Sequence, residues 1–70
     1  MPVARFRIKD PSTGLFFRDG RRIVRTLPVG SVIKVDHTIL DGDQLVDVLW
    51  ENEKVLMFTQ DIRARAEREP

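Results

Sequence analysis

The segment Leu45–Phe58 most constrains what this chain can fold into. It consists of two apolar runs joined by the polar residues 51–54, and it holds the only tryptophan, Trp50. Successive side chains of a strand point to opposite faces, and in both runs each of the two faces carries apolar residues. The segment therefore predicts a hairpin in the centre of a sheet, or one whose second face is covered by something else.

Shorter strands are predicted before this hairpin. Residues 4–9 alternate between apolar and basic side chains, which is the pattern of a half-buried strand. The dipeptide Asp19-Gly20 favours a two-residue turn between strands at about 15–18 and 21–27, because a type I′ turn needs a positive φ at both central residues. In the second of these strands Ile23 and Val24 are adjacent, so one of them faces away from the core or a bulge intervenes. Residues 32–37 alternate again.

The last residues change from a strand pattern to a helix pattern. Thr59 is suited to cap the N-terminus of a helix at about 60–68, with Asp61 in its first turn. Ile62 and Ala66 are four residues apart and lie on one face of that helix. A helix of about ten residues is marginal on its own, so we expect it to dock through this face.

Length and composition limit the chain to one domain, residues 1–70. Its 41% hydrophobic and 33% charged residues are typical of a folded protein. It has no cysteine, so no disulfide reinforces a thin core. Short strands at intervals of about 8–12 residues, with turns marked by glycine, predict a mainly β fold. We expect a small barrel of about five antiparallel strands followed by a short C-terminal helix.

Two stretches resemble the bacterial SH3-type repeat. They are Phe6–Thr13, a strand and its following loop, and Arg25–Val35, which contains the turn Leu27-Pro28-Val29-Gly30-Ser31. The resemblance implies an SH3-like small barrel that binds a ligand or partner. From Leu27 onward the chain is also similar to the SH3-like domains that accompany bacterial ferrous-iron transporters. The run from Gly30 into the terminal helix resembles the carbon-storage-regulator RNA-binding proteins.

Charge is distributed unevenly along the chain. Residues 1–34 carry a net charge of +6 and residues 35–70 a net charge of −5. The basic half either forms an interaction surface or mixes with the acidic half on the surface of the fold. Cations beside aromatic rings can bind phosphate backbones and stack bases, and cations on a strand edge can also simply prevent aggregation. The candidate residues for anion or nucleic-acid binding are Arg5, Arg7, Arg18, Arg21, Arg22 and Arg25.

Aromatic and apolar residues suggest a protein-binding surface. We expect a partner to bind near Phe16, Phe17 and Trp50. The second apolar face of the central hairpin either packs under the terminal helix or binds another copy of the chain. The candidate residues for such a homo-oligomer are Leu45, Leu49, Leu56 and Phe58.

Motifs for catalysis or metal binding are absent from the sequence. His37 is the only histidine, Ser12 and Ser31 lie in no nucleophile motif, and the acidic residues 36–47 do not have the spacing of a calcium loop. We therefore expect a non-enzymatic binding or adaptor module for a protein partner, without cofactor or metal, or alternatively a nucleic-acid-binding barrel. The N-terminal residues resemble no signal peptide, and no run approaches the roughly 20 apolar residues of a membrane span, so we expect a bacterial cytoplasmic protein.

Overall fold

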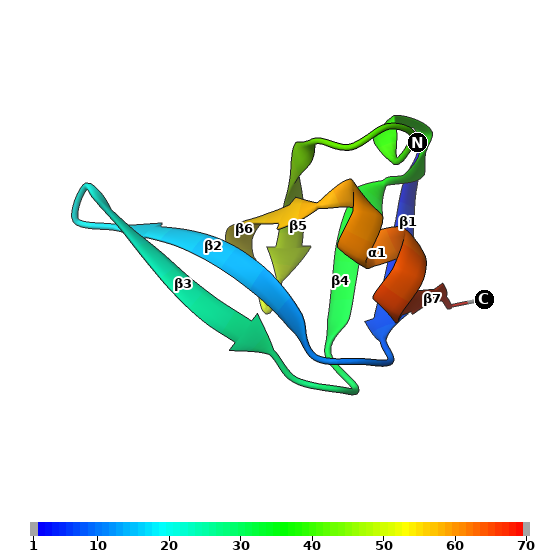
Figure 1. Ribbon diagram of the computed structural model, residues 1–70, viewed down its shortest axis with the longest axis horizontal. Coiled ribbons are helices and arrows are strands. Elements are labelled where there is room, and N and C mark those ends of the chain that lie inside the picture. Colours follow the sequence, from blue (N-terminus) through cyan, green and yellow to red (C-terminus); the bar gives the residue numbers. More distant parts are fainter. Residues whose placement is uncertain (1, 70) are drawn as a thin grey trace.

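The structure is a computed structural model that describes residues 2–69. These residues form seven strands, a short 3-10 helix and one α-helix (Figure 1). In chain order the elements are β1 Val3–Ile8, β2 Ser12–Arg18, β3 Arg21–Leu27, β4 Val32–Asp36, the 3-10 helix η1 His37–Ile39, β5 Leu45–Trp50, β6 Glu53–Phe58, α1 Thr59–Arg65 and β7 Ala66–Arg68. The predicted mainly β fold with a short C-terminal helix is confirmed.

The seven strands form one antiparallel sheet in the order β3-β2-β6-β5-β4-β1-β7. The sheet is not closed, so the predicted barrel of about five strands is wrong in both strand number and closure. β2 and β6 are paired at a single position, Leu15 with Leu56, and beyond it the β2–β3 hairpin leaves the body of the molecule. Figure 1 shows this hairpin, which we call the arm, extending to one side, far from β7 at the opposite edge of the sheet.

Both hairpins turn at two residues with positive φ. Asp19 and Gly20 have φ of 52° and 73°, which confirms the turn predicted between β2 and β3. Glu51 and Asn52 have φ of 52° and 63°, so the turn of the central hairpin is two residues long and Glu53 already belongs to β6. Right-handed strand twist favours such turns in short hairpins.

β2 begins at Ser12, although residues 10–14 read as a turn in the sequence. Gly14 explains this, because the absence of a side chain at this position permits close packing against neighbouring strands rather than a bend in the chain. A Cβ on Gly14 would lie 2.5 Å from Cδ1 of Leu27 and 2.7 Å from Cγ1 of Val55, both fully buried residues. The arm therefore joins the core through its glycine.

The core lies on one face of the sheet, which we call the inner face. It combines residues of strands that are far apart in the sheet order, such as Ile8 of β1, Phe16 of β2 and Val55 of β6, so the sheet curls around it. Ile62 of α1 is fully buried in the same cluster, and Ala66 packs against it. Both residues that the sequence indicated therefore pack on the core, Ile62 from the helix and Ala66 from the start of β7.

The helix is shorter than predicted, because residues 66–68 form β7 against β1 instead of continuing it. Thr59 is not its N-cap. It is the first helical residue and fully buried, and its hydroxyl donates to the Gly42 carbonyl at 2.7 Å and accepts from the Gln44 N–H at 3.2 Å. Arg63 donates to the carbonyls of Leu40 and Gly42. These bonds attach the η1–β5 loop to the helix.

Adjacent phenylalanines in β2 provide a direct test of this fold. Phe16 is 1% exposed and Phe17 is 59% exposed, on opposite faces of the sheet. Phe16→Ala should lower the free energy of unfolding by about 3–5 kcal/mol, because it opens a cavity in the core. Phe17→Ala should lower it by about 0.5 kcal/mol or less, as surface substitutions do. Urea unfolding followed by Trp50 fluorescence measures both, and equal losses would contradict the assigned faces.

Candidate interaction surface

The outer face of the sheet, opposite the core, carries most of the exposed apolar side chains. In the central hairpin Leu45 pairs with Phe58, and Leu49 pairs with Lys54. Leu45, Leu49 and Phe58 are 43%, 46% and 47% exposed, whereas the alternate residues of both strands point inward. The hairpin therefore has the two apolar faces that its sequence predicts, and only one of them is covered.

The apolar surface continues from the hairpin onto the arm. Leu56 of β6 pairs with Leu15 of β2, and Leu15 pairs with Val24 of β3. Val24 is 64% exposed and Phe17, on the same face of β2, is also exposed. The register is continuous through Ile23 and Val24 without a bulge, so Val24 is the residue that faces away from the core. We call the following set the outer apolar face: Leu15, Phe17, Val24, Leu45, Leu49, Leu56 and Phe58.

The terminal helix does not cover this face. The sequence left two explanations for the second apolar face of the hairpin, namely burial under the helix and contact with another chain. Ile62 and Ala66 pack into the core on the inner face, while Leu45 and Phe58 remain exposed. Burial under the helix is thus excluded as the explanation.

The three aromatic residues predicted to bind a partner do not form one exposed surface. Phe16 is buried and Trp50 is half-buried, and their rings meet edge to face with centroids 5.9 Å apart and an interplanar angle of 68°. Arg25 places its guanidinium 5.8 Å from the centroid of the Phe16 ring. Phe17 alone of the three lies on the outer face. Phe16 therefore offers no free surface, and Trp50 offers only part of its ring.

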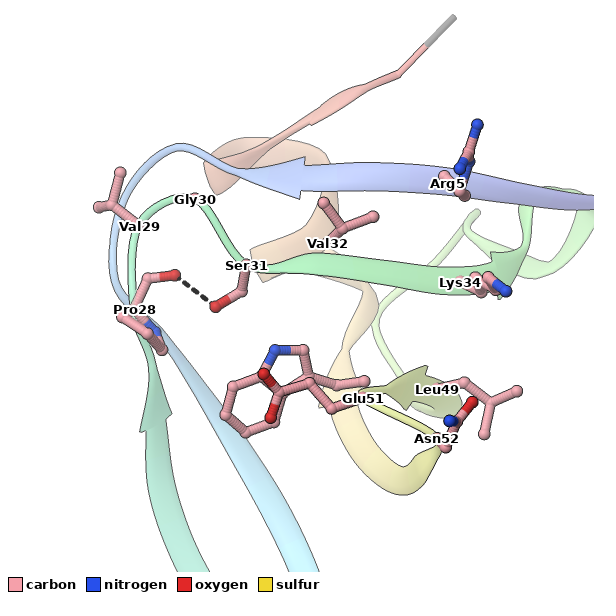
Figure 2. A pocket seen from close by; sticks show the side chains of 11 residues that line it. Arg5, Pro28, Val29, Gly30, Ser31, Val32, Lys34, Leu49, Glu51 and Asn52 are labelled. Atoms are coloured by element: carbon pink, nitrogen blue, oxygen red, sulfur yellow. Dashed lines mark hydrogen bonds between the residues drawn. The ribbon is translucent and has the colours of Figure 1, made fainter.

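Trp50 also lines a groove of about 570 Å³ at one end of the outer face (Figure 2). The β3–β4 turn forms one end of it, where Ser31 donates a hydrogen bond to the Pro28 carbonyl at 2.7 Å. Arg5 and Lys34 lie at the other end, directly opposite each other on β1 and β4. Like charges in such a pair repel each other, so this end of the groove favours an anionic group.

The predicted cations separate into paired and unpaired groups. Arg7 makes a salt bridge with Glu69 at 2.5 Å, and Arg18 makes one with Glu53. Within residues 2–69, four of the six candidates make no salt bridge. They are Arg5, Arg21, Arg22 and Arg25. Three of these lie on β3, so the unpaired positive charge is concentrated on the arm.

Sequence reasoning missed two features of this surface. Lys34 and Lys54 extend the positive charge across the outer face, and neither makes a salt bridge in the described part of the chain. Val24 was ambiguous, because the sequence does not show which of two adjacent apolar residues faces the core. Its neighbours Arg22 and Thr26, polar and on the same face, are the signal that could have resolved it.

The residues considered for catalysis lie in different parts of the described structure. Exposed His37 begins η1, and the hydroxyls of Ser12 and Ser31 donate to the carbonyls of Asp10 and Pro28. Residues 2–69 contain no group of three or more side chains arranged to hold a metal ion. None of their helices is both long and apolar enough to cross a membrane.

No protein-family model matches this chain, and searches of curated proteins and of solved structures found no similar protein.

Asp36 provides a test of the local electrostatics beside the outer face. The hydroxyl and the N–H of Thr38 donate to its carboxylate at 2.6 Å and 2.9 Å, and they hold the pKa of Asp36 below its usual value. Their stabilising effect is present above the unfolded pKa and is lost as the pH falls through the folded one. Thr38→Val should raise the pKa of Asp36, because the hydroxyl donor is lost. A carboxyl NMR titration measures this, and an unchanged pKa would contradict the assigned bonds.

Proposed function

We propose that this protein is a non-enzymatic binding module that docks on another protein chain through its outer apolar face. The observation that carries the proposal is the exposure of Leu45, Leu49 and Phe58 on a face that no other part of the described chain covers. Monomeric soluble proteins rarely expose contiguous apolar surface of this kind unless it is used for binding. Unpaired cations such as Lys34 and Lys54 adjoin the apolar residues, as in the polar rim of a protein interface.

The order of the elements supports an SH3-like arrangement. In chain order the β2–β3 hairpin comes between β1 and β4, which pair with each other. The strands β4, β5 and β6 then form a meander, and α1 precedes the short last strand β7, which pairs with β1. The resemblance implies a closed barrel of about five strands, from which this open sheet and its last strand differ. Fold likeness alone does not assign a function, so the outer apolar face carries the proposal. The cytoplasmic location stays a prediction of the sequence.

Site-specific photo-crosslinking in the producing cell tests this function. A photoreactive phenylalanine analogue at Leu45 should give one discrete crosslinked product, since the partner covers this position. The same analogue at Ala64, which is exposed on α1, should give none. Phe58→Glu should abolish the Leu45 product, because it places a charge beside Leu45 in the interface.

The mass of the product identifies the occupant. A product of twice the chain mass would mean that a second copy binds there, as predicted for Leu45, Leu49, Leu56 and Phe58. Purified Phe58→Glu should keep its stability to within about 0.5 kcal/mol, so that a lost crosslink reports binding rather than folding. Absence of any product at Leu45, or an equal product at Ala64, would contradict the proposal.

A second candidate function is nucleic-acid binding by the arm. It is favoured by the concentration of Arg21, Arg22 and Arg25 on one protruding strand without salt bridges in the described chain. Phosphate backbones attract such clusters, and exposed Phe17 beside them could stack on a base. The exposed apolar residues of the central hairpin, Leu45, Leu49 and Phe58, have no role in this function, which is why we rank it second.

Oligonucleotide titration distinguishes this candidate from protein binding. If the arm binds phosphates, affinity for mixed-sequence DNA or RNA should fall steeply between low and moderate salt, because released counterions drive such binding. Arg21→Glu should weaken it about tenfold, since it removes one charge and adds an opposite one. Arg68→Glu, an equally exposed charge reversal far from the arm, should have little effect. Equal effects of the two variants would show only a response to net charge.

A further inference from the structure

β3 is the long free edge of the sheet. It has seven residues, contains no proline or bulge, and pairs with β2 on one side. The opposite edge, β7, has three residues. Natural proteins usually shorten, bend or cover a sheet edge, because unpaired N–H and C=O groups can pair with any extended chain. On β3 the only such device is the charge of its arginines.

The turn fixes which backbone groups of β3 are free. Asp19 and Gly20 form a two-residue turn, so Arg18 and Arg21 are the hydrogen-bonded pair that closes it. Hydrogen-bonded and non-hydrogen-bonded pairs then alternate along an antiparallel ladder. Ile23 and Arg25 bond to β2, whereas Arg22, Val24 and Thr26 direct their N–H and C=O groups away from it. Three donors and three acceptors at alternate residues thus form a template for an added strand.

Charge determines what kind of strand fits this edge. Arg21, Arg22 and Arg25 make no salt bridge within residues 2–69, and they lie on both faces of β3. Side chains on an added antiparallel strand would lie about 5 Å from them, where like charges repel and opposite charges attract. A second copy of β3 would bring three more arginines to the same ribbon. An acidic strand would instead neutralise them.

We propose that β3 binds an extended acidic segment of a protein partner as an eighth antiparallel strand. This inference rests on the proposed protein-binding function and specifies the partner's chemistry. The segment carries an acidic residue opposite Arg25, apolar residues opposite Val24 and Ile23, and acidic residues opposite Arg22 and Arg21. One of the apolar residues lies beside Val24 and extends the row of outer-face side chains formed by Leu56, Leu15 and Val24. Main-chain bonds supply affinity and the alternate side chains supply specificity.

Amide exchange and peptide titration test the proposal. The probe is the capped peptide Thr-Glu-Val-Val-Glu-Glu-Thr, and its matched control has lysine in place of each glutamate. In the free protein the amides of Arg22, Val24 and Thr26 should exchange at least tenfold faster than those of Ile23 and Arg25. The glutamate peptide should slow the three fast amides at least tenfold, because they become donors to the added strand. The lysine peptide should leave them unchanged.

Two variants test whether peptide binding depends on the free backbone edge of β3 and on the charge of its arginines. Val24→Pro removes an N–H that does not bond to β2, so it should weaken peptide binding at least tenfold, while Val24→Thr keeps that N–H and should bind nearly as well. If Val24→Pro disturbs the arm, the double variant Arg22→Glu/Arg25→Glu still decides. It should bind the lysine peptide and lose the glutamate peptide, because both residues are exposed and the substitutions reverse their charge.

The outcomes separate this inference from the proposed function. Protection that appears on raising the protein concentration without peptide would mean that a second copy pairs there, and it would overturn the proposal. Chemical shift changes with oligonucleotides but no protection by the glutamate peptide would also overturn it, in favour of nucleic acid. Phe58→Glu lies outside β3 and should leave peptide binding intact. Loss of the Leu45 crosslink without loss of peptide binding would therefore show that face docking and strand addition are independent.

Discussion

The structure depends on how few elements are present to cover the two faces of its sheet. A seven-stranded sheet has two faces, and residues 2–69 supply one α-helix of seven residues and one 3-10 helix of three. Apolar side chains are buried from solvent only where another layer, or the curl of the sheet itself, encloses them. Ile62 of the helix and the curled inner face enclose one core. No layer of the described chain remains for the outer face, so Leu45, Leu49 and Phe58 stay exposed.

The arm is anchored to the body at its base and extends away from it at its tip. Near its base Gly14 and Leu27 are buried, and Phe16 packs against Trp50 of the central hairpin. Toward its tip the arm extends away from the body, and the edge of β3 pairs with no other strand of the described chain. One end is therefore fixed by the core, while the other presents unpaired arginines and backbone groups. Rigid anchoring of an exposed edge lowers the entropy lost when a partner binds.

Local patterns in the sequence were enough to predict several elements. The Asp19-Gly20 turn, the alternation in residues 4–9 and the two faces of the central hairpin all follow from preferences that act over a few residues. Ile62 docks on the core as its place in the predicted helix indicates, whereas Ala66 reaches the core from β7. The predicted barrel and the end of the helix were wrong, because both depend on pairing between distant strands. Residues 66–68 continue a helical pattern, but β1 offers them a ladder that an isolated helix does not.

The sequence by itself determined most of the strands, the Asp19-Gly20 turn and the uneven distribution of charge, since these depend on residue type and spacing. It also indicated that the second apolar face of the central hairpin contacts either the terminal helix or another chain. Only the tertiary structure decided that α1 takes the inner face, that Phe16 is buried while Phe17 is not, and that β3 ends the sheet as a free edge. The physical reason is that burial and edge position depend on which strands lie side by side, and that choice is made by packing the whole chain around one core.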